Sequence, residues 1–322
     1  ATGKLEPLDD VWTNKEWKKF APAVRKHCTG SDGHIYFAPH YSVITVLYYR
    51  KDLFKAAGFE PPKTVNEFYT DAKVLTKDVN GDGIVDIYGY GFPGTIGQDI
   101  TNWTLALARQ LGGPLGLFNK EGKCAVDTKP WIDAVTLLRK MYSEKIVPPG
   151  LTAWKDSDLA EAFKGGSLAM MVNFTAMMPS LKSEGSAVKN KFDFAAWTGP
   201  IGNWGYAIPK VIPNEKKKIA KLFVKHMSSY EANLNEALYE NWATRLDVLD
   251  DPLLLKKWGP KKLLILKECM ERGVPIYGGV NQYLISVEIL AEALQAAITG
   301  KKDVETALRD AANAIRGVVP GS

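Results

Sequence analysis

Residues 33–54 read GHIYFAPHYSVITVLYYRKDLF, and this stretch decides the fold class. Its alternating apolar and β-branched residues predict strands over 35–38 and 43–49. Residues 51–60, which overlap the end of this stretch, carry a short helical pattern that stops at Gly58. Strands that alternate with helices are typical of α/β proteins, so the same alternation is expected further along the chain.

The alternation continues after residue 60. Thr64 and Glu67 form a capping-box pattern before a helix with an apolar stripe. Further strands are expected over 84–92, 167–175, 192–197 and 204–208, and further helices over 102–111, 130–145 and 156–164. From residue 215 onward the pattern is almost all helical, over 215–239, 251–272, 282–299 and 302–316. These patterns predict an α/β fold with a helical C-terminal region.

The bulk composition is that of a globular chain large enough for two domains or two lobes. Its 322 residues are 46% hydrophobic and 24% charged. The basic residues behind the net charge of +5 are spread along the chain, so nucleic acid is not an expected partner. No apolar run is long enough to span a membrane, and the polar opening ATGKLEPLDD holds no signal peptide. The three cysteines lack the spacing of a zinc site or a disulfide framework.

The sequence lacks the common catalytic motifs. It contains no GxSxG, no HExxH and no phosphate loop. Residues 89–94 match GxGxxG, but Pro93 interrupts the pattern where a dinucleotide site needs a helix, and residues 109–120 hold no acidic residue. The alternative is a glycine-rich strand exit that lets the backbone approach a ligand or another strand. The absence of these motifs makes an enzyme less expected but does not exclude one.

Residues 78–86, DVNGDGIVD, match the first nine positions of a calcium-binding loop. The oxygen ligands would come from Asp78, Asn80, Asp82, the Ile84 carbonyl and Asp86. The twelfth position is Gly89, where such loops carry a bidentate glutamate. The loop therefore has two readings: a structural calcium site, or a turn whose side chains cap their own backbone. No cofactor is required, and calcium is the one ion that this loop could hold, in a structural role.

Six segments follow one another along the chain in an order that identifies a family. They are residues 33–68, AKVLTKDVNGDGIVDIYGYGF, FKGGSLAMMVNFT, NWGYAIPK, ENWATRLDV and YLISVEILAEALQAAITGKKDVETALRDAA. Together they resemble the extracellular solute-binding proteins of bacterial ABC importers, in the carbohydrate-binding branch that includes the maltose-binding protein.

The resemblance implies an α/β, two-lobed periplasmic-binding-protein fold of type II, with hinge crossings near 40–45 and 205–210. The N-terminal lobe would comprise 1–42 and 208–252, and the C-terminal lobe 43–207 and 253–322. In the family a segment like GKLEPLDD lies well inside the chain, so the resemblance implies an N-terminal truncation and an incomplete first lobe. An incomplete lobe exposes sheet edges, and oligomerisation would recover some of the lost burial.

Sugar recognition needs flat aromatic faces and planar polar groups, because a pyranose has apolar C–H faces and a rim of hydroxyls. On the resemblance, the residues suited to stacking are Tyr41, Trp103 and Trp204, those suited to binding hydroxyls are Asn173 and Arg245, and His40 and Trp242 lie near them. The alternative for each Trp is packing inside a lobe.

The resemblance implies that the chain binds a sugar or oligosaccharide, closes about a hinge, and delivers the ligand to the membrane subunits of an ABC transporter. It implies no enzymatic activity and a periplasmic or extracellular location, lipid-anchored forms included. Two alternatives stay open, a glycan-active hydrolase with a calcium-stabilised fold and a binder of a non-sugar solute.

Overall fold

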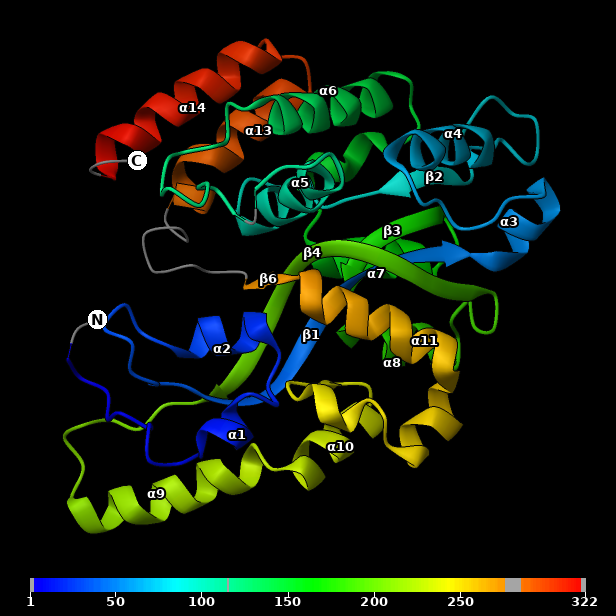
Figure 1. Ribbon diagram of the computed structural model, residues 1–322. Helices are drawn as coiled ribbons and strands as arrows, with labels where there is room; N and C mark the ends of the chain where they lie inside the picture. The colour runs from blue at the N-terminus through cyan, green and yellow to red at the C-terminus, as the bar shows by residue number, and fades with distance from the viewer. Residues whose placement is uncertain (1–2, 115, 276–284, 320–322) are drawn as a thin grey trace. The chain divides into compact units, whose positions relative to one another are not determined.

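The computed structural model describes residues 3–114, 116–275 and 285–319 (Figure 1). The chain divides into two compact units. Unit 1 comprises Ala1–Ile44 and Pro200–Ile276, and unit 2 comprises Thr45–Gly199 and Tyr277–Ser322. Two long strands, β1 (Ala38–Arg50) and β4 (Phe192–Tyr206), each begin in one unit and end in the other.

The sheet of unit 2 joins β1 to two further strands. β2 (Tyr88–Gly91) pairs in parallel with β3 (Leu168–Phe174), and β3 pairs antiparallel with β1 so that Val46 lies opposite Asn173. Helix α4 (Val65–Leu75) packs on β2, where the Phe68 and Tyr90 rings lie 4.8 Å apart. Burial of these apolar faces is what holds the helix against the sheet.

Besides α4, unit 2 contains seven further α-helices in its described residues, and four of them form a layer. The seven are α3 (Lys51–Ala57), α5 (Gln98–Gln110), α6 (Lys129–Ser143), α7 (Asp156–Lys164), α8 (Met178–Lys182), α13 (Ala291–Ile298) and α14 (Val304–Val318). α13 packs against α5, α6 and α14, and the four lie together in Figure 1. Short helical turns occur at Pro149–Ala153, Thr175–Met177 and Ile285–Leu290.

Unit 1 contains parts of β1 and β4, two short strands and a set of helices. Its helices are α1 (Asn14–Trp17), α2 (Pro22–Cys28), α9 (Asn214–Met227), α10 (Tyr230–Leu238) and α11 (Pro252–Arg272), with a helical turn at Leu246–Val248. β5 (Trp242–Ala243) pairs antiparallel with β1, and β6 (Val274–Pro275) pairs in parallel with β4. In the core of this unit the Trp242 and Trp258 rings lie 5.1 Å apart.

The predicted α/β alternation is confirmed, and the start of α4 shows why. The Thr64 side chain accepts a hydrogen bond from the Glu67 N–H, and the Glu67 carboxylate accepts one from the Thr64 N–H, which completes the predicted capping box. Such a box satisfies backbone donors that have no partner inside the helix. The local sequence therefore sets this boundary by itself.

Several predicted element boundaries were wrong. In place of the two strands expected over 35–38 and 43–49 there is one strand, β1. β4 runs unbroken through Gly199, where we expected two strands. A Cβ on Gly199 would lie 2.7 Å from Thr45 Cγ2, so glycine permits a close approach to β1 there. The helix predicted over 215–239 is two helices, because Ser229 caps α10 through the Ala232 N–H. The strand predicted over 84–92 is only β2, since residues before Tyr88 belong to the preceding loop.

The division into units also differs from the predicted lobes. Residues 253–276, which we placed in the C-terminal lobe, belong to unit 1, and so do residues 200–207. α11 packs against α2 and α10 of unit 1, and its Trp258 contacts Trp242. The first residues of the helix predicted over 282–299 lie outside the described part of the chain.

Candidate functional site

Unit 1 presents an aromatic surface formed by Tyr41 of β1 and Trp204 of β4. Their ring centroids lie 6.2 Å apart and the ring planes are within 15° of parallel. Trp204 is 58% exposed although it lies within a long strand. A large exposed aromatic ring that is held by a stacked neighbour is a suitable platform for a flat apolar ligand face.

A chain of polar groups adjoins this aromatic surface. His40 Nε2 lies 3.0 Å from Glu236 Oε1, and the Tyr206 hydroxyl lies 3.5 Å from His40 Nδ1. The other Glu236 oxygen accepts a hydrogen bond of 3.1 Å from Asn241 Nδ2. Burial, and then the charge of Glu236, raise the pKa of the Tyr41 hydroxyl, so Tyr41 stays neutral and can donate a hydrogen bond.

One further polar pair lies where β1 and β4 are neighbours. The Ser42 hydroxyl donates a 2.7 Å hydrogen bond to Asn203 Oδ1. The Asn203 Nδ2 group is enclosed and has no acceptor within the described residues. An enclosed donor without a partner is costly, and a ligand or water oxygen would satisfy it.

The structure brings together three of the seven residues predicted to bind ligand, namely His40, Tyr41 and Trp204. Trp242 and Arg245 belong to the same unit but are buried in its core. Trp242 packs on Trp258, and Arg245 forms a two-pronged pair with Asp247 while lying over the Phe20 ring. These contacts leave Trp242 no free face and give Arg245 a structural partner.

The two predicted residues of unit 2, Trp103 and Asn173, are also buried. Trp103 packs on Phe174 with centroids 4.9 Å apart, and its indole N–H donates to Asp156 at 2.6 Å. Asn173 Oδ1 accepts from the Phe174 N–H, while its Nδ2 group is enclosed without an acceptor. Both side chains are thus packed within unit 2, and for Trp103 this is the alternative that the sequence left open.

Asp156 has unusual electrostatics for a carboxyl group. Its backbone N–H donates to Asp99 Oδ2 at 3.4 Å, so two carboxyl groups approach each other at the start of α7. Burial, and then the charge of Asp99, raise the pKa of Asp156 to about 7, against the hydrogen bond from Trp103 that lowers it. Burial also raises the pKa of Asp99.

The loop over 78–86 folds as a series of side-chain caps. Asp78 accepts hydrogen bonds from the Gly81 and Gly83 N–H groups, both at 2.7 Å, and Asp82 accepts from the Ile84 N–H. Asn80 caps the Asp82 N–H and Asp86 caps the Val79 N–H in the same way. Within the described residues no group of three His, Cys, Asp or Glu side chains is arranged to hold a metal ion. The calcium reading of this loop stays a prediction.

Five residues of the site were missed by sequence reasoning, and two of them, Ser42 and Asn203, lie next to predicted residues in β1 and β4. Tyr206 carried a signal, because it lies two residues after Trp204 in the same strand and strand periodicity groups such positions. Glu236 of α10 and Asn241, which follows α10, carried none, since both are far from His40 in the sequence and nothing local marks either side chain. No helix in the described ranges has the length and apolarity to cross a membrane.

Comparison with known proteins identifies the fold and the family. The family model for bacterial extracellular solute-binding proteins matches residues 1–234. A putative binding protein of Brucella abortus is 25% identical over 330 residues, which cover 96% of this chain and 74% of that protein. A probable ABC transporter-binding protein of Deinococcus radiodurans is 24% identical over 296 residues, covering 89% of this chain and 64% of its own.

Solved structures agree with this relationship. Maltose-bound MalE3 of T. maritima has a TM-score of 0.83 and 24% identity, covering 98% of this chain and 81% of that one. The GacH receptor of Streptomyces glaucescens, solved unliganded and with acarbose, has a TM-score of 0.80 and 21% identity, covering 99% and 80%. These likenesses confirm the predicted periplasmic-binding-protein fold. Because the family match extends over residues 1–234, most of the chain, this protein belongs to the family of bacterial extracellular solute-binding proteins.

Proposed function

We propose that the protein binds a sugar or oligosaccharide and delivers it to a bacterial ABC importer. The observation that carries this proposal is the exposed Trp204 ring stacked beside Tyr41. An exposed tryptophan costs hydration free energy in the unliganded protein, and covering its face with the C–H groups of a pyranose would remove that cost.

The polar chain beside the aromatic surface supplies the second requirement of sugar binding. Sugar hydroxyls both donate and accept hydrogen bonds. Glu236 and His40 are held by each other and by Asn241 and Tyr206, so their orientation is set before a ligand arrives. Preorganised polar groups bind more tightly because less side-chain entropy is lost on binding.

The proteins that share this fold support a sugar or polyol as the ligand. Their structures were solved with maltose, with acarbose, and with the polyol ribitol. A small polyol offers hydroxyls without a ring face, so it would use the polar chain more than the Trp204 ring. The exposed aromatic surface therefore favours a cyclic sugar over an open-chain polyol.

We further propose that the protein has no catalytic activity and is located outside the cytoplasmic membrane. The family to which the chain belongs consists of extracellular binding proteins, and relatives include a lipoprotein of Bacillus subtilis. The hydrolase alternative makes a distinct prediction, which is that the sugar is cleaved.

A thermal-shift screen tests the proposal directly. The purified chain is heated with maltose, maltotriose, tagatose, mannitol and ribitol at concentrations from micromolar to millimolar. A ligand at 100 times its Kd stabilises the folded form by about 2.7 kcal/mol, which is a measurable rise in Tm. The recovered sugar is then checked by chromatography. No stabilisation by any sugar would contradict the proposal, and a cleaved sugar would favour the hydrolase.

A further inference from the structure

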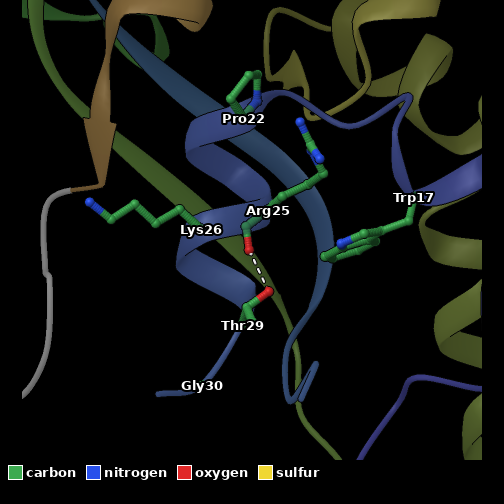
Figure 2. Close-up of a pocket in the computed structure, with 6 residues that line it drawn as sticks. All are labelled: Trp17, Pro22, Arg25, Lys26, Thr29 and Gly30. Carbon is green, nitrogen blue, oxygen red and sulfur yellow. Dashed lines mark hydrogen bonds between the residues drawn. The ribbon is translucent and has the colours of Figure 1, made fainter. Parts of the chain in front are cut away.

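Unit 1 carries a surface cavity beside α2 that the proposed sugar site does not use (Figure 2). Its volume is about 460 Å³, and it is lined by Trp17, Pro22, Arg25, Lys26, Thr29 and Gly30. This volume falls within the range of small-molecule sites, roughly 300–1,000 Å³. None of the lining residues belongs to the aromatic surface or to its polar chain.

The Arg25 guanidinium in this cavity has no partner within the described residues. It forms no ion pair, no side-chain hydrogen bond and no stacking contact with an aromatic ring, and its Nε group is enclosed without an acceptor. The lining residues contain no carboxylate. Glu16 of α1 is engaged with Thr13, and Asp247 with Arg245 and Lys19. Asp32, beside Gly30, accepts hydrogen bonds from the Tyr36 hydroxyl and the His34 N–H. An enclosed donor of this kind calls for an acceptor that the protein itself does not supply.

Trp17 provides a fixed apolar wall next to this guanidinium. Its ring lies 5.2 Å from both the Trp12 and Phe20 rings, so neighbouring side chains hold it in place. Figure 2 shows the Trp17 and Arg25 side chains on one side of α2, with Lys26 extending on the other side. The Thr29 hydroxyl donates to the Arg25 carbonyl at 2.8 Å and anchors the end of the helix.

The charge of the chain is divided in a way that favours anions at this cavity. Unit 1 holds 19 Lys and Arg against 14 Asp and Glu, whereas unit 2 holds 22 of each. The whole net charge of +5 is therefore carried by unit 1. Such a field raises the local concentration of anionic ligands and speeds their association.

We propose that this cavity is a binding site for a small ring compound that carries an oxyanion, of the class of acidic sugars or sugar phosphates. The ring lies against Trp17, and the carboxylate or phosphate accepts hydrogen bonds from the Arg25 fork. Lys26 adds a second positive charge from the other side of α2. This site is separate from the aromatic surface, so it does not depend on the proposed function.

Calorimetry at low ionic strength tests the proposal with glucuronate and glucose 6-phosphate as probes. Glucose and inorganic phosphate are the controls that carry only the ring or only the charge. The variants are Arg25→Gln, which removes the guanidinium, and Lys256→Gln, which removes an exposed, unpaired charge of the same unit outside the cavity. Trp204→Ala removes the proposed sugar platform from the measurement. Circular dichroism confirms that each variant is folded.

At least one acidic probe should bind about tenfold more tightly than glucose and than phosphate, because it alone uses both the wall and the fork. Arg25→Gln should abolish that advantage, while Lys256→Gln should keep it within about twofold. Both variants are compared in the Trp204→Ala background, so that sugar binding at the aromatic surface does not contribute. The tighter of the two probes shows whether the site prefers a carboxylate or a phosphate. Equal binding of glucose and the acidic probes, or equal losses in Arg25→Gln and Lys256→Gln, would overturn the proposal.

Discussion

Replacing Trp204 by alanine should weaken sugar binding while leaving the fold intact. A tryptophan side chain presents about 250 Å² of surface, and the 58% that is exposed here amounts to roughly 145 Å². A sugar ring stacked on one face covers about half of that, or ~70 Å². At about 25 cal/mol per Å² of apolar area, the loss is ~1.8 kcal/mol, which corresponds to a roughly 20-fold rise in Kd.

Isothermal titration of the best sugar from the thermal screen measures this change. Tyr239→Ala is the matched control, because Tyr239 is an aromatic residue of the same unit, 78% exposed, that does not belong to the aromatic surface. Tyr239→Ala should leave Kd within about twofold, as expected for a substitution that touches no ligand. Equal Kd values for wild type and Trp204→Ala, in a protein that does bind the sugar, would refute the placement of the site at Trp204.

Three further predictions concern stability. Because the pKa of Asp156 is raised to about 7, folding takes up a proton between the ordinary pKa near 3.8 and pH 7, so this group makes the protein less stable as pH rises through that window. Asp156→Asn, whose side chain still accepts a hydrogen bond from Trp103, should reduce the loss of unfolding free energy between pH 5 and pH 8. At pH 8 the variant should be more stable by on the order of 2 kcal/mol, as measured by urea unfolding at both pH values. The same pH dependence in variant and wild type would contradict a buried carboxyl that holds a proton. Trp242→Ala removes a fully buried ring that packs on Trp258. It should lower the free energy of unfolding by about 3–5 kcal/mol in the same assay. A loss below about 1 kcal/mol would show that the core of unit 1 is loosely packed. If the loop over 78–86 holds calcium, adding calcium should raise Tm, a chelator should reverse the rise, and Asp78→Ala should abolish it; no calcium effect in the wild type would leave the loop as a self-capped turn.

The parts of the fold that were predicted correctly are those determined by neighbouring residues. The capping box at Thr64 and Glu67 needs only a four-residue pattern, and it starts α4 where predicted. β4 was misjudged because Gly199 and Pro200 resemble a strand break in the sequence alone. Their role becomes clear only beside β1 and β6, where Gly199 allows close approach and Pro200 lies opposite Val274.

The candidate site was predictable in its residue types and only partly in its members. Trp103, Trp204 and Trp242 have similar sequence surroundings of polar and small residues, yet only Trp204 is exposed. Burial of a tryptophan depends on which distant segment packs over it, Phe174 in one case and Trp258 in another. One sequence does not contain that information in local form, and for the same reason Glu236 could not be assigned to His40.

The separation of charge between the units gives the two candidate sites different physical characters. The aromatic surface relies on apolar area and on hydrogen bonds among partnered groups, and such interactions respond weakly to salt. The cavity at Arg25 relies on an unpaired guanidinium in a unit that carries the whole net charge, so its binding should weaken steeply as the Debye length falls from about 30 Å at 0.01 M salt to about 8 Å at 0.15 M. Raising the ionic strength should therefore weaken the binding of an acidic sugar at the cavity, while the binding of a neutral sugar at the aromatic surface should change little. Because the two sites share no residue, their binding energies should add, and each can be altered without loss of the other.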